Sequence, residues 1–517
     1  MRIDDFSFSD LRQLSVSAGG IPTFLACVDQ DTWLHTAATL HQAGGRLIAL
    51  WGGELGAAQE FVVSAAYGLE EGLLWLQLPT QMASGYPDLS QLFPCAVRMQ
   101  RAVYDLLGVR AQGADDLRPW LNHGKWPSDY FPLQQRFSGT EHFDLPEVDY
   151  PFVSVAGEGV HEIAVGPIHA GVIEPGHFRF SVVGEKMLRL EERFAYVHRG
   201  IERLFENTPL PQAHRLAGRI AGDSTVAFSW AFCMALEQAT GSSVAPRALW
   251  LRALLLERER VANHLGDLGA LGNDAGFGYG LAQFSRLKED WVRLHQQMVG
   301  HRYLMDQIVP GGVAQDLTAD AVSAILAQCD QIEETVQVLQ GMYENHSGLQ
   351  DRFAGAGILS ATVAHHFGVC GLVGRASAQR FDLRGTHPYA PYDEVRVQMI
   401  SEPGGDVAAR VTLRFREIYE SLRLIRLFCI NLPAGGVIDG LGQGNFPSHG
   451  AGWVEGWRGD VLVTLQLDAN GKISRCHCHD PSWQNWPALE YAIIGNIVPD
   501  FPLINKSFNL NYAGHDL

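Results

Sequence analysis

The sequence predicts an α+β protein with a small N-terminal α+β domain, residues 1–135, and a larger, mainly α-helical bundle domain with peripheral β-hairpins, residues 161–517. Short strand-like apolar segments crowd the first part of the chain, and long segments of helical periodicity occupy its middle. A linker rich in Pro, Asp and Gly, residues 136–160, lies between them. Such composition is typical of a domain boundary.

The N-terminal domain is expected to contain two helices and several strands. A helix is predicted over residues 31–44, and a strand follows over residues 46–53. Two further strand-like segments, residues 60–69 and 71–79, are separated by a Glu-Glu-Gly turn. A second helix is predicted from Val97 to Leu107, where apolar residues recur at helical spacing.

The second domain is expected to open with a β-hairpin and to continue as a helix bundle. Residues 178–183 and 186–193 alternate in polarity around Gly184-Glu185, which is a hairpin signal. Near the end, residues 452–480 predict two strands joined by an Asp-Ala-Asn-Gly turn. Helical periodicity between these parts covers residues 229–241, 247–272, 321–345 and 412–432. Long helices of this kind pack into bundles.

Composition and charge exclude several classes of protein. Hydrophobic residues make up 46% and charged residues 19% of the chain, which is typical of a folded globular protein. The formal net charge of −18 argues against nucleic acid and against direct binding to an anionic lipid surface. No apolar run approaches the roughly 18–20 residues that span a bilayer, and the acidic start lacks a secretion signal. We therefore expect a cytoplasmic protein that reaches a membrane only through partners, with its eight scattered cysteines reduced.

Short motifs along the chain resemble two subunits of respiratory complex I. The first domain resembles the 30-kDa-type subunit through Phe93-Pro94, residues 104–109 and Asp116-Leu117-Arg118. The rest resembles the 49-kDa-type subunit and the related large subunit of NiFe hydrogenases. The matching motifs are Gly166-Pro167-Ile168-His169, residues 174–178, residues 198–202, Asn263-His264-Leu265, Pro310-Gly311-Gly312, Asp382-Leu383-Arg384 and Trp457-Arg458-Gly459. The fusion of both units most resembles group 4 hydrogenases of the formate-hydrogenlyase type.

The resemblance also implies where a metal centre would be. In this family two Cys-x-x-Cys pairs hold nickel and iron. The first pair would fall on Ala221 and Ser224 and the second within residues 501–507, and cysteine is absent from both places. Because soft metals need soft ligands, we expect a divergent member without a nickel–iron centre. The chain also ends at Leu517 without the tail that accompanies nickel insertion in typical hydrogenases.

A quinone site of the complex I type would also be incomplete. The resemblance implies that a tyrosine and a histidine hold the quinone head group. The histidine corresponds to His169 or His177, whereas the tyrosine position falls on Gly222. Glycine has no side chain with which to bind a quinone. A quinone therefore stays one candidate acceptor beside a small substrate.

Three residues near the hairpin are candidates for proton transfer. His169, Glu174 and His177 belong to a segment dense in Gly and Pro, and functional residues often lie on such loops. A histidine there would titrate near neutral pH, and Glu174 could exchange protons beside it. The alternative is a hydrogen-bonded structural cluster.

Three charged residues are candidates at the former metal position. Arg219 and Asp223 flank it in sequence, and if they face one cavity they could form an ion pair that fills the space. Arg458 matches an arginine that faces the active site in hydrogenases. We expect it to meet either an anion or a carboxylate of its own chain.

Two further clusters look less like functional sites. Cys476-His477-Cys478-His479 would place its cysteines on one face of a strand and its histidines on the other, so the four side chains would not converge on one ion. Glu257, Glu259 and Arg260 lie on the longest predicted helix. We expect them to form a solvated or interfacial face.

Two functions are consistent with the sequence. The first is a subunit of a membrane-bound oxidoreductase complex that couples electron transfer to ion translocation. It would bind no cofactor itself, pair with a small iron–sulfur subunit, rest above antiporter-like membrane subunits and lie at the cytoplasmic face of the membrane. The chain carries no iron–sulfur ligand pattern of its own. The second function is a non-catalytic scaffold that couples conformational change to ion movement.

Overall fold

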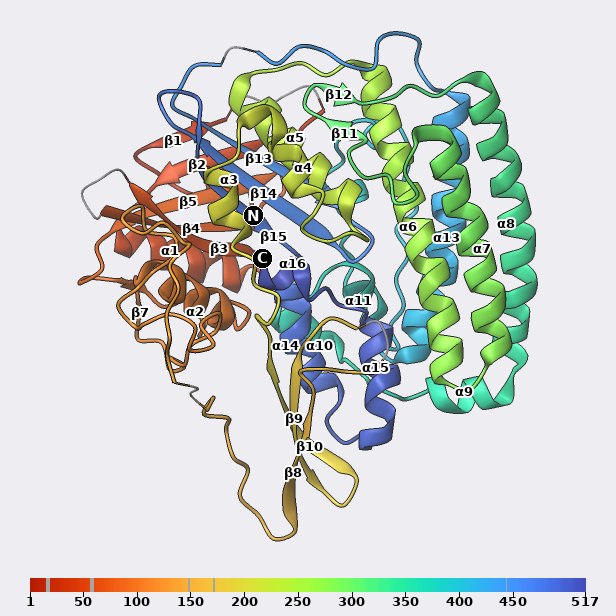
Figure 1. Ribbon diagram of the computed structural model, residues 1–517, viewed down its shortest axis with the longest axis horizontal. Coiled ribbons are helices and arrows are strands. Elements are labelled where there is room, and N and C mark those ends of the chain that lie inside the picture. The colour runs from red at the N-terminus through yellow and green to blue at the C-terminus, as the bar shows by residue number, and fades with distance from the viewer. Residues whose placement is uncertain (15–18, 56–59, 147–148, 171–172, 443) are drawn as a thin grey trace.

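The computed structural model describes residues 1–517 except 15–18, 56–59, 147–148, 171–172 and 443. An N-terminal sheet unit and a helical unit lie side by side, and a three-stranded arm projects away from both (Figure 1). The predicted α+β class is confirmed. The domain boundaries at residues 135 and 161 stay predictions.

The N-terminal unit is built on a five-stranded sheet with the order β1-β2-β5-β4-β3, in which only β2 and β5 pair in parallel. Its central strands are buried on both faces because α2 covers one side of β3 and the C-terminal sheet approaches the other. The predicted helices and strands of this unit are present. Their bounds are β1 Leu11–Gln13, β2 Thr23–Cys27, α1 Gln30–Gln42, β3 Leu47–Leu55, β4 Glu60–Gly68, β5 Leu73–Thr80, β6 Tyr86–Pro87, α2 Ala96–Leu107 and β7 Ala111–Gln112.

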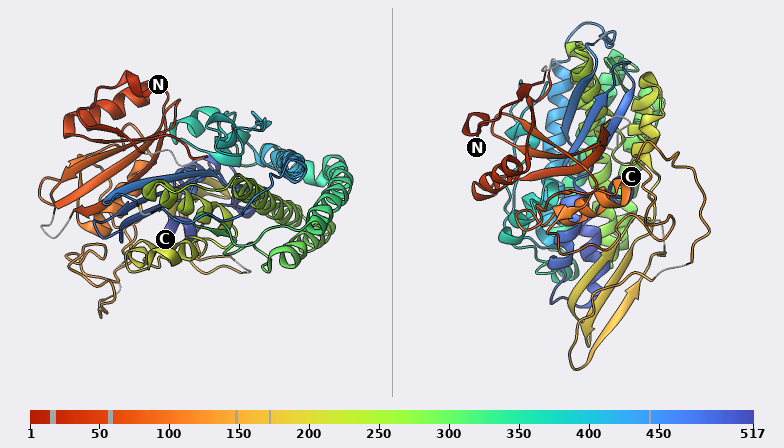
Figure 2. Two further views of the ribbon diagram at one scale, coloured as in Figure 1. Left: turned by 90° about the horizontal axis from the view of Figure 1, so that it is seen from above. Right: turned by 90° about the vertical axis from the view of Figure 1, so that its left-hand side faces the viewer.

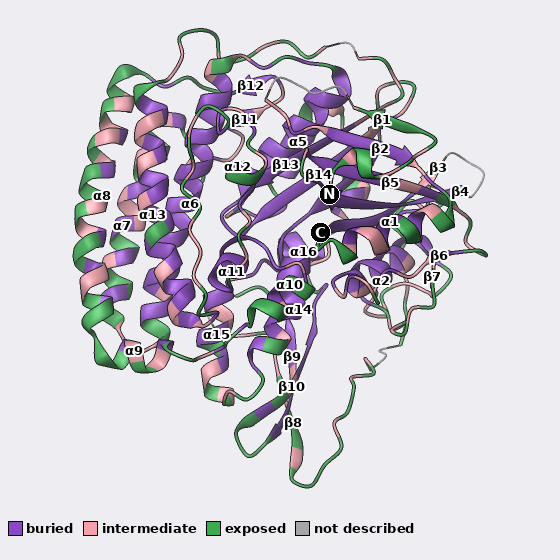
Figure 3. Ribbon diagram, turned by 180° about the vertical axis from the view of Figure 1, so that it is seen from behind, coloured by how far each residue is buried: buried purple, intermediate pink, exposed green. Residues whose placement is uncertain are grey.

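The projecting arm is an antiparallel sheet with the order β10-β9-β8. Its strands are β8 (Val160–Val165), β9 (His177–Val183) and β10 (Lys186–Arg193), and the predicted turn at Gly184 joins the last two. Described residues between 113 and 159 contain no helix or strand. Strand β8 has no buried residue and is green and pink in Figure 3, whereas β9 and β10 are largely buried and are purple along much of their length.

The helical unit is arranged around α6, which is buried along most of its 29 residues. α7 and α13 flank it, and α8 lies at the outer edge, farthest from the N-terminal sheet (Figure 2). The sequence prediction missed α7. The long helices are α5 Thr225–Thr240, α6 Pro246–Asp274, α7 Gly278–Val299, α8 Ala319–Asn345 and α13 Val407–Ile430. The shorter elements are α3 Ile201–Glu206, α4 Ala213–Ala217, β11 Ile308–Val309, β12 Gly312–Val313, α9 Ser347–Phe353, α10 Ala361–His366, α11 Gly371–Ala376, α12 Leu383–Thr386, α14 Ser482–Ala492, α15 Phe501–Phe508 and α16 Ala513–Asp516.

A three-stranded antiparallel sheet joins the two units. It comprises β13 (Ser448–Glu455), β14 (Asp460–Leu467) and β15 (Ile473–His479), one strand more than the sequence predicted. Trp51 of the N-terminal sheet stacks on His477 at 4.8 Å between ring centroids, and Arg475 donates to the carbonyl of Gly52 at 2.7 Å. On the other side α5 lies directly against β13.

The expected solvated face on α6 was wrong, because Glu257, Glu259 and Arg260 are all buried. Arg384 and Arg260 donate to Glu257 at 2.9 and 3.1 Å, and Tyr392 adds a hydrogen bond of 2.6 Å. Burial alone would raise the pKa of Glu257, but the two arginines hold that pKa at about 2. Residues that look like a polar helix face in the sequence are therefore satisfied inside the protein.

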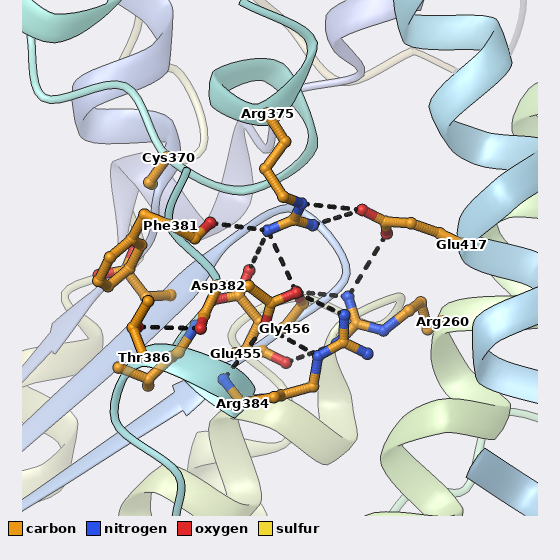
Figure 4. A network of polar contacts seen from close by, with 12 residues as sticks. Arg260, Cys370, Arg375, Phe381, Asp382, Arg384, Thr386, Glu417, Glu455 and Gly456 are labelled. Carbon is orange, nitrogen blue, oxygen red and sulfur yellow. Dashed lines mark hydrogen bonds and ion pairs between the residues drawn. The ribbon is translucent and has the colours of Figure 1, made fainter. Parts of the chain in front are cut away.

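Arg260 and Arg384 belong to a larger buried network (Figure 4). Arg375 of α11 donates to Glu417 of α13 at 2.5 Å and to Glu455 of β13 at 2.9 Å. Arg260 of α6 also donates to the backbone carbonyl of Glu455 at 2.8 Å. Removing one partner from such a network leaves a buried charge unpaired, which is far more costly than the loss of an exposed ion pair.

None of the helices in the described part of the chain combines the length and apolarity needed to cross a bilayer.

The close packing of α5 on β13 depends on glycine. A Cβ atom at Gly452 would lie 1.9 Å from the carbonyl oxygen of Ala231. We therefore expect Gly452→Ala to destabilise the protein by about 1–3 kcal/mol or more through overpacking, measured as a lower midpoint of thermal unfolding. Gly341→Ala is the matched control, because a Cβ there meets no atom within 4 Å. An unchanged midpoint for Gly452→Ala would contradict this close packing.

Candidate functional site

A cavity of about 790 Å³ lies where four segments meet that are distant in the sequence. Its lining comes from selected described residues within 165–178, 219–223, 263–288 and 501–513, together with Arg199 and Arg458. The resemblance assigned one metal-ligand pair to the segment at Ala221 and the other to the start of α15. Both segments contribute to this lining. The fold thus brings together the two segments that the sequence alone could only assign separately.

The loop before α5 is held in place by α6. Ser224, at the start of α5, provides no side-chain cap. Instead, Glu259 accepts hydrogen bonds from the backbone N–H groups of Val226 and Ala227 at 2.7 and 3.3 Å. Carboxylates at a helix N-terminus satisfy its unpaired N–H groups. Burial nevertheless raises the pKa of Glu259 to about 8.

Asp223 is fixed through its backbone as well as its side chain. Its carbonyl oxygen accepts from the side-chain amide of Asn263 at 2.8 Å and from the indole N–H of Trp457 at 2.9 Å. Its carboxylate receives two hydrogen bonds from Arg458, at 2.9 and 2.7 Å. Burial would raise the pKa of Asp223, but Arg458 reverses the effect and lowers it.

Arg458 connects the two main walls of the cavity. Besides Asp223 it donates through Nε to the carbonyl of Asn509 at 2.6 Å, just after α15. Its guanidinium lies 4.0 Å from the centre of the Trp457 ring. The expectation that Arg458 meets a carboxylate of its own chain is confirmed. A planar guanidinium suits this role because it can donate to two partners at once.

The predicted ion pair between Arg219 and Asp223 was wrong. Arg219 lines the cavity, but its guanidinium binds Asp306 at 2.6 and 2.8 Å. Asp306 lies on the loop after α7, and no local pattern in the sequence indicated that this loop would come so close. Asp223 instead forms an ion pair with Arg458, so Arg219 and Asp223 bind different residues.

His169 and Glu174 both line the cavity, as their candidacy requires. Nε2 of His169 lies 2.7 Å from the carbonyl oxygen of Gly176, so this nitrogen donates a hydrogen bond to it. Glu174 accepts from the backbone N–H of Ala513 at 3.1 Å. Burial raises the pKa of Glu174, and the nearby negative charge of Asp223 raises it further.

His177 does not line the cavity. It is buried on β9, with Nδ1 3.3 Å from the carbonyl of Gly166 and its ring against Phe152. The next residue, Phe178, lines the cavity instead. Successive side chains of a strand point to opposite faces, so His177 and Phe178 cannot both line the cavity. Burial lowers the pKa of His177, which favours a neutral structural imidazole.

Comparison with known proteins identifies the family. Residues 26–143 match the model of the respiratory-chain NADH dehydrogenase 30 Kd subunit, and residues 274–449 match that of its 49 Kd subunit. Formate hydrogenlyase subunit 5 of Escherichia coli (strain K12) is 31% identical over 92% of this chain and 85% of its own length. The chain belongs to the complex I and group 4 hydrogenase family.

Other members of this family are similar over much of the chain. Carbon monoxide-induced hydrogenase of Rhodospirillum rubrum is 31% identical over 68% of this chain and 97% of its own length. An NADH-quinone oxidoreductase subunit of Phocaeicola vulgatus is 29% identical over 74% of this chain and 77% of its own length. Among solved structures, a chain of the archaeal membrane-bound sulfane sulfur reductase matches with a TM-score of 0.65 and 24% identity, covering 70% of this chain and 100% of that chain, which is a likeness of fold. The protein is therefore a subunit related to those of membrane respiratory complexes.

The cavity residues do not fit the nickel–iron centre of the hydrogenases in this family. The lining in the described part of the chain contains no cysteine, and Ala221 presents a methyl group where a thiolate would stand. A soft metal requires sulfur donors. Two charged side chains of the lining, Asp223 and Arg458, are instead paired with each other.

The cysteine–histidine segment belongs to the core. On β15, the Sγ atoms of Cys476 and Cys478 lie 3.9 Å apart, while His477 contacts Glu202 at 2.7 Å. No group of three or more His, Cys, Asp or Glu side chains in the described ranges is arranged to hold a metal ion.

Sequence reasoning missed several cavity residues. Arg199 donates to the carbonyls of Ile220 and Ala513 at 2.7 and 3.2 Å, and so joins the two walls. Its place in the motif of residues 198–202 was a signal that could have found it. Lys288 of α7 also reaches the cavity, and an amphipathic helix carries no local sign of that.

The Asp223–Arg458 pair can be measured by a double-mutant cycle of Asp223→Asn and Arg458→Met. Asp223 is 41% exposed to the cavity, so we expect a coupling energy of about 1 kcal/mol in urea unfolding at neutral pH. Because Arg458 lowers the pKa of Asp223, the coupling is present above the ordinary aspartate pKa of about 3.9 and is lost as pH falls through the lowered value.

The matched control for this cycle is the more exposed pair of Arg219 and Asp306. We expect its coupling energy to be smaller than that of Asp223 and Arg458, because solvent screens it more strongly. Equal coupling in the two pairs, or a coupling that grows as the pH falls, would show that Arg458 does not hold Asp223 as the geometry indicates.

Proposed function

We propose that this chain is the large hydrophilic subunit of a membrane-bound oxidoreductase complex that transfers electrons without a nickel–iron centre. The observation that carries the proposal is the cavity of about 790 Å³, whose lining includes Ala221 and the start of α15, the segments to which the resemblance assigns the metal ligands, and whose described lining has charged groups but no cysteine. Family membership supplies the redox context, and the donor set argues against hydrogen chemistry.

The proposal includes partner subunits. A small iron–sulfur subunit delivers electrons to the cavity, and antiporter-like membrane subunits couple the electron transfer to ion translocation. The chain itself lies peripherally at the cytoplasmic face of the membrane. Support comes from relatives whose names place them in formate hydrogenlyase and NADH-quinone oxidoreductase assemblies.

Within the cavity, the acceptor is a quinone or a small substrate, and its protons come from the chain. Glu174 has a raised pKa, so its carboxyl keeps a proton to higher pH than an ordinary glutamic acid. His169 lies in the same lining, and its Nδ1 is not the nitrogen that binds the Gly176 carbonyl. Together they can hold and pass on a proton. Asp223 and Arg458 fix the walls between which the acceptor binds.

The open cavity favours this function over a non-catalytic scaffold. A scaffold would gain stability if apolar side chains filled the space, because buried charged groups carry a desolvation cost. The neighbouring small subunit separates the two functions. If its cluster nearest to this chain can be reduced in the purified complex, the redox function stands. If that cluster's ligands are absent, the scaffold function replaces it.

Metal analysis of the purified complex tests the proposal directly. We expect iron from the partner's clusters and nickel far below one atom per copy of this chain, because the described lining of the cavity offers no cysteine to hold it. Hydrogen uptake by the same preparation should be absent. Stoichiometric nickel, or hydrogen uptake above that of a control preparation, would overturn the proposed function.

Glu174→Gln tests the proton role. We expect turnover of the assembled complex to fall on the order of 10²-fold, because an amide keeps the shape but cannot release a proton. Glu162→Gln is the matched control, since Glu162 is exposed on β8 and pairs with Arg179 at 3.1 Å. His177→Ala should stay near wild type in turnover. Unchanged turnover in Glu174→Gln would remove this residue from the mechanism.

A further inference from the structure

Lys288 is a cation in the cavity lining without a partner among the described residues. It extends from α7 and is half-buried. The other lining cations of the described chain all have hydrogen-bond or ion-pair partners: Arg199 on backbone carbonyls, Arg219 on Asp306, Arg458 on Asp223 and Lys506 on Asn509. The structure shows no hydrogen bond or ion pair between Lys288 and any described residue.

The Lys288 side chain can reach the cavity because the residue that it crosses on α6 is a glycine. Gly266 lies in the middle of α6 and also lines the cavity. A Cβ atom at this position would lie 2.9 Å from Nζ of Lys288 and 3.2 Å from its Cδ. Glycine is one of the poorest helix formers, so its presence here is explained by the side chain that crosses it.

The carboxylates around Lys288 are already occupied. Asp223 is close enough for Lys288 to help lower its pKa, but Arg458 holds both of its oxygens. Asp267, one residue after Gly266, accepts from Arg414 at 2.9 Å and from Asn509 at 2.6 Å. Within the described chain, Lys288 therefore has no carboxylate of its own at ion-pair distance. A partly desolvated ammonium is strongly stabilised by an anion that accepts a hydrogen bond from it.

We propose that Lys288 binds the negative charge of the cavity's ligand, and that this ligand is a small anion. The proposal rests on the proposed function in that it takes the cavity to be a ligand site. An uncharged ring would leave Lys288 without a counter-charge. Gly266 is then a positioning residue, because it keeps the path of the lysine side chain open.

Lysine modification with an acetylating reagent tests the proposal without any need for turnover. The full chain in its complex is labelled with and without sodium sulfate, thiosulfate or nitrate, at constant ionic strength set with chloride, and each lysine is quantified by mass spectrometry. At least one anion should protect Lys288 about tenfold when present at ten times its dissociation constant. Lys186 and Lys472 are exposed outside the cavity and should label equally in all samples.

Two variants of the site and one control make the test specific. A protective anion should raise the thermal midpoint of the wild type and of Lys472→Met, but not of Lys288→Met. Gly266→Ala should also lose the effect, because its methyl group displaces the ammonium while the helix gains a better helix former. Protection of Lys288 by none of the anions, or stabilisation that persists in Lys288→Met, overturns the proposal.

The outcome is distinguishable from failure of the proposed function. Anion binding at Lys288 in a complex whose partner cluster passes no electrons to the cavity would remove the redox function and leave the anion site. Electron transfer in a complex in which no anion protects Lys288 would remove the anion site and leave the redox function.

Discussion

Helix α6 determines much of this structure, because it is buried although its sequence is rich in charge. Each buried charge on it has to be met by a group from another element. Arg384 donates a hydrogen bond to Glu257, and the backbone N–H of Val226 in α5 donates one to Glu259. Glu417 of α13 lies 2.9 Å from Nε2 of His264. Arg258 lies 4.0 Å from the Trp291 ring of α7, so an aromatic face meets this charge. The contacts that these charged side chains make thereby fix the positions of the neighbouring helices around α6.

The cavity is a consequence of that arrangement. The same helix that satisfies its charges in the core presents Asn263, Gly266 and Asp267 at its cavity face. Asn263 holds the backbone of Asp223, and Asp267 binds the side chain of Asn509. The two walls that carry metal-binding thiolates in hydrogenases of this family are thus held apart by hydrogen bonds to α6. The space between them is the cavity of about 790 Å³.

Hydrogen bonds from two arginines connect those walls. Arg458 joins Asp223 to Asn509, and Arg199 joins Ile220 to Ala513. Both use guanidinium groups, which can donate to several oxygens from one planar head. A metal centre would impose a fixed coordination geometry, whereas these bonds leave room for a ligand between the walls. Charged groups in such a cavity can also select ligands of the opposite charge.

The sequence by itself determined the elements whose periodicity is strong and the family to which the chain belongs. The hairpin at Gly184 and the long helices other than α7 followed from local pattern, and the segments at Ala221 and the start of α15 followed from motif order. Tertiary structure alone decided which side chains meet. Arg219 turned to Asp306, His177 faced away from the cavity, and Lys288 reached it across Gly266. Local pattern depends on neighbours along the chain, but ion pairing and strand orientation depend on groups that only packing brings close.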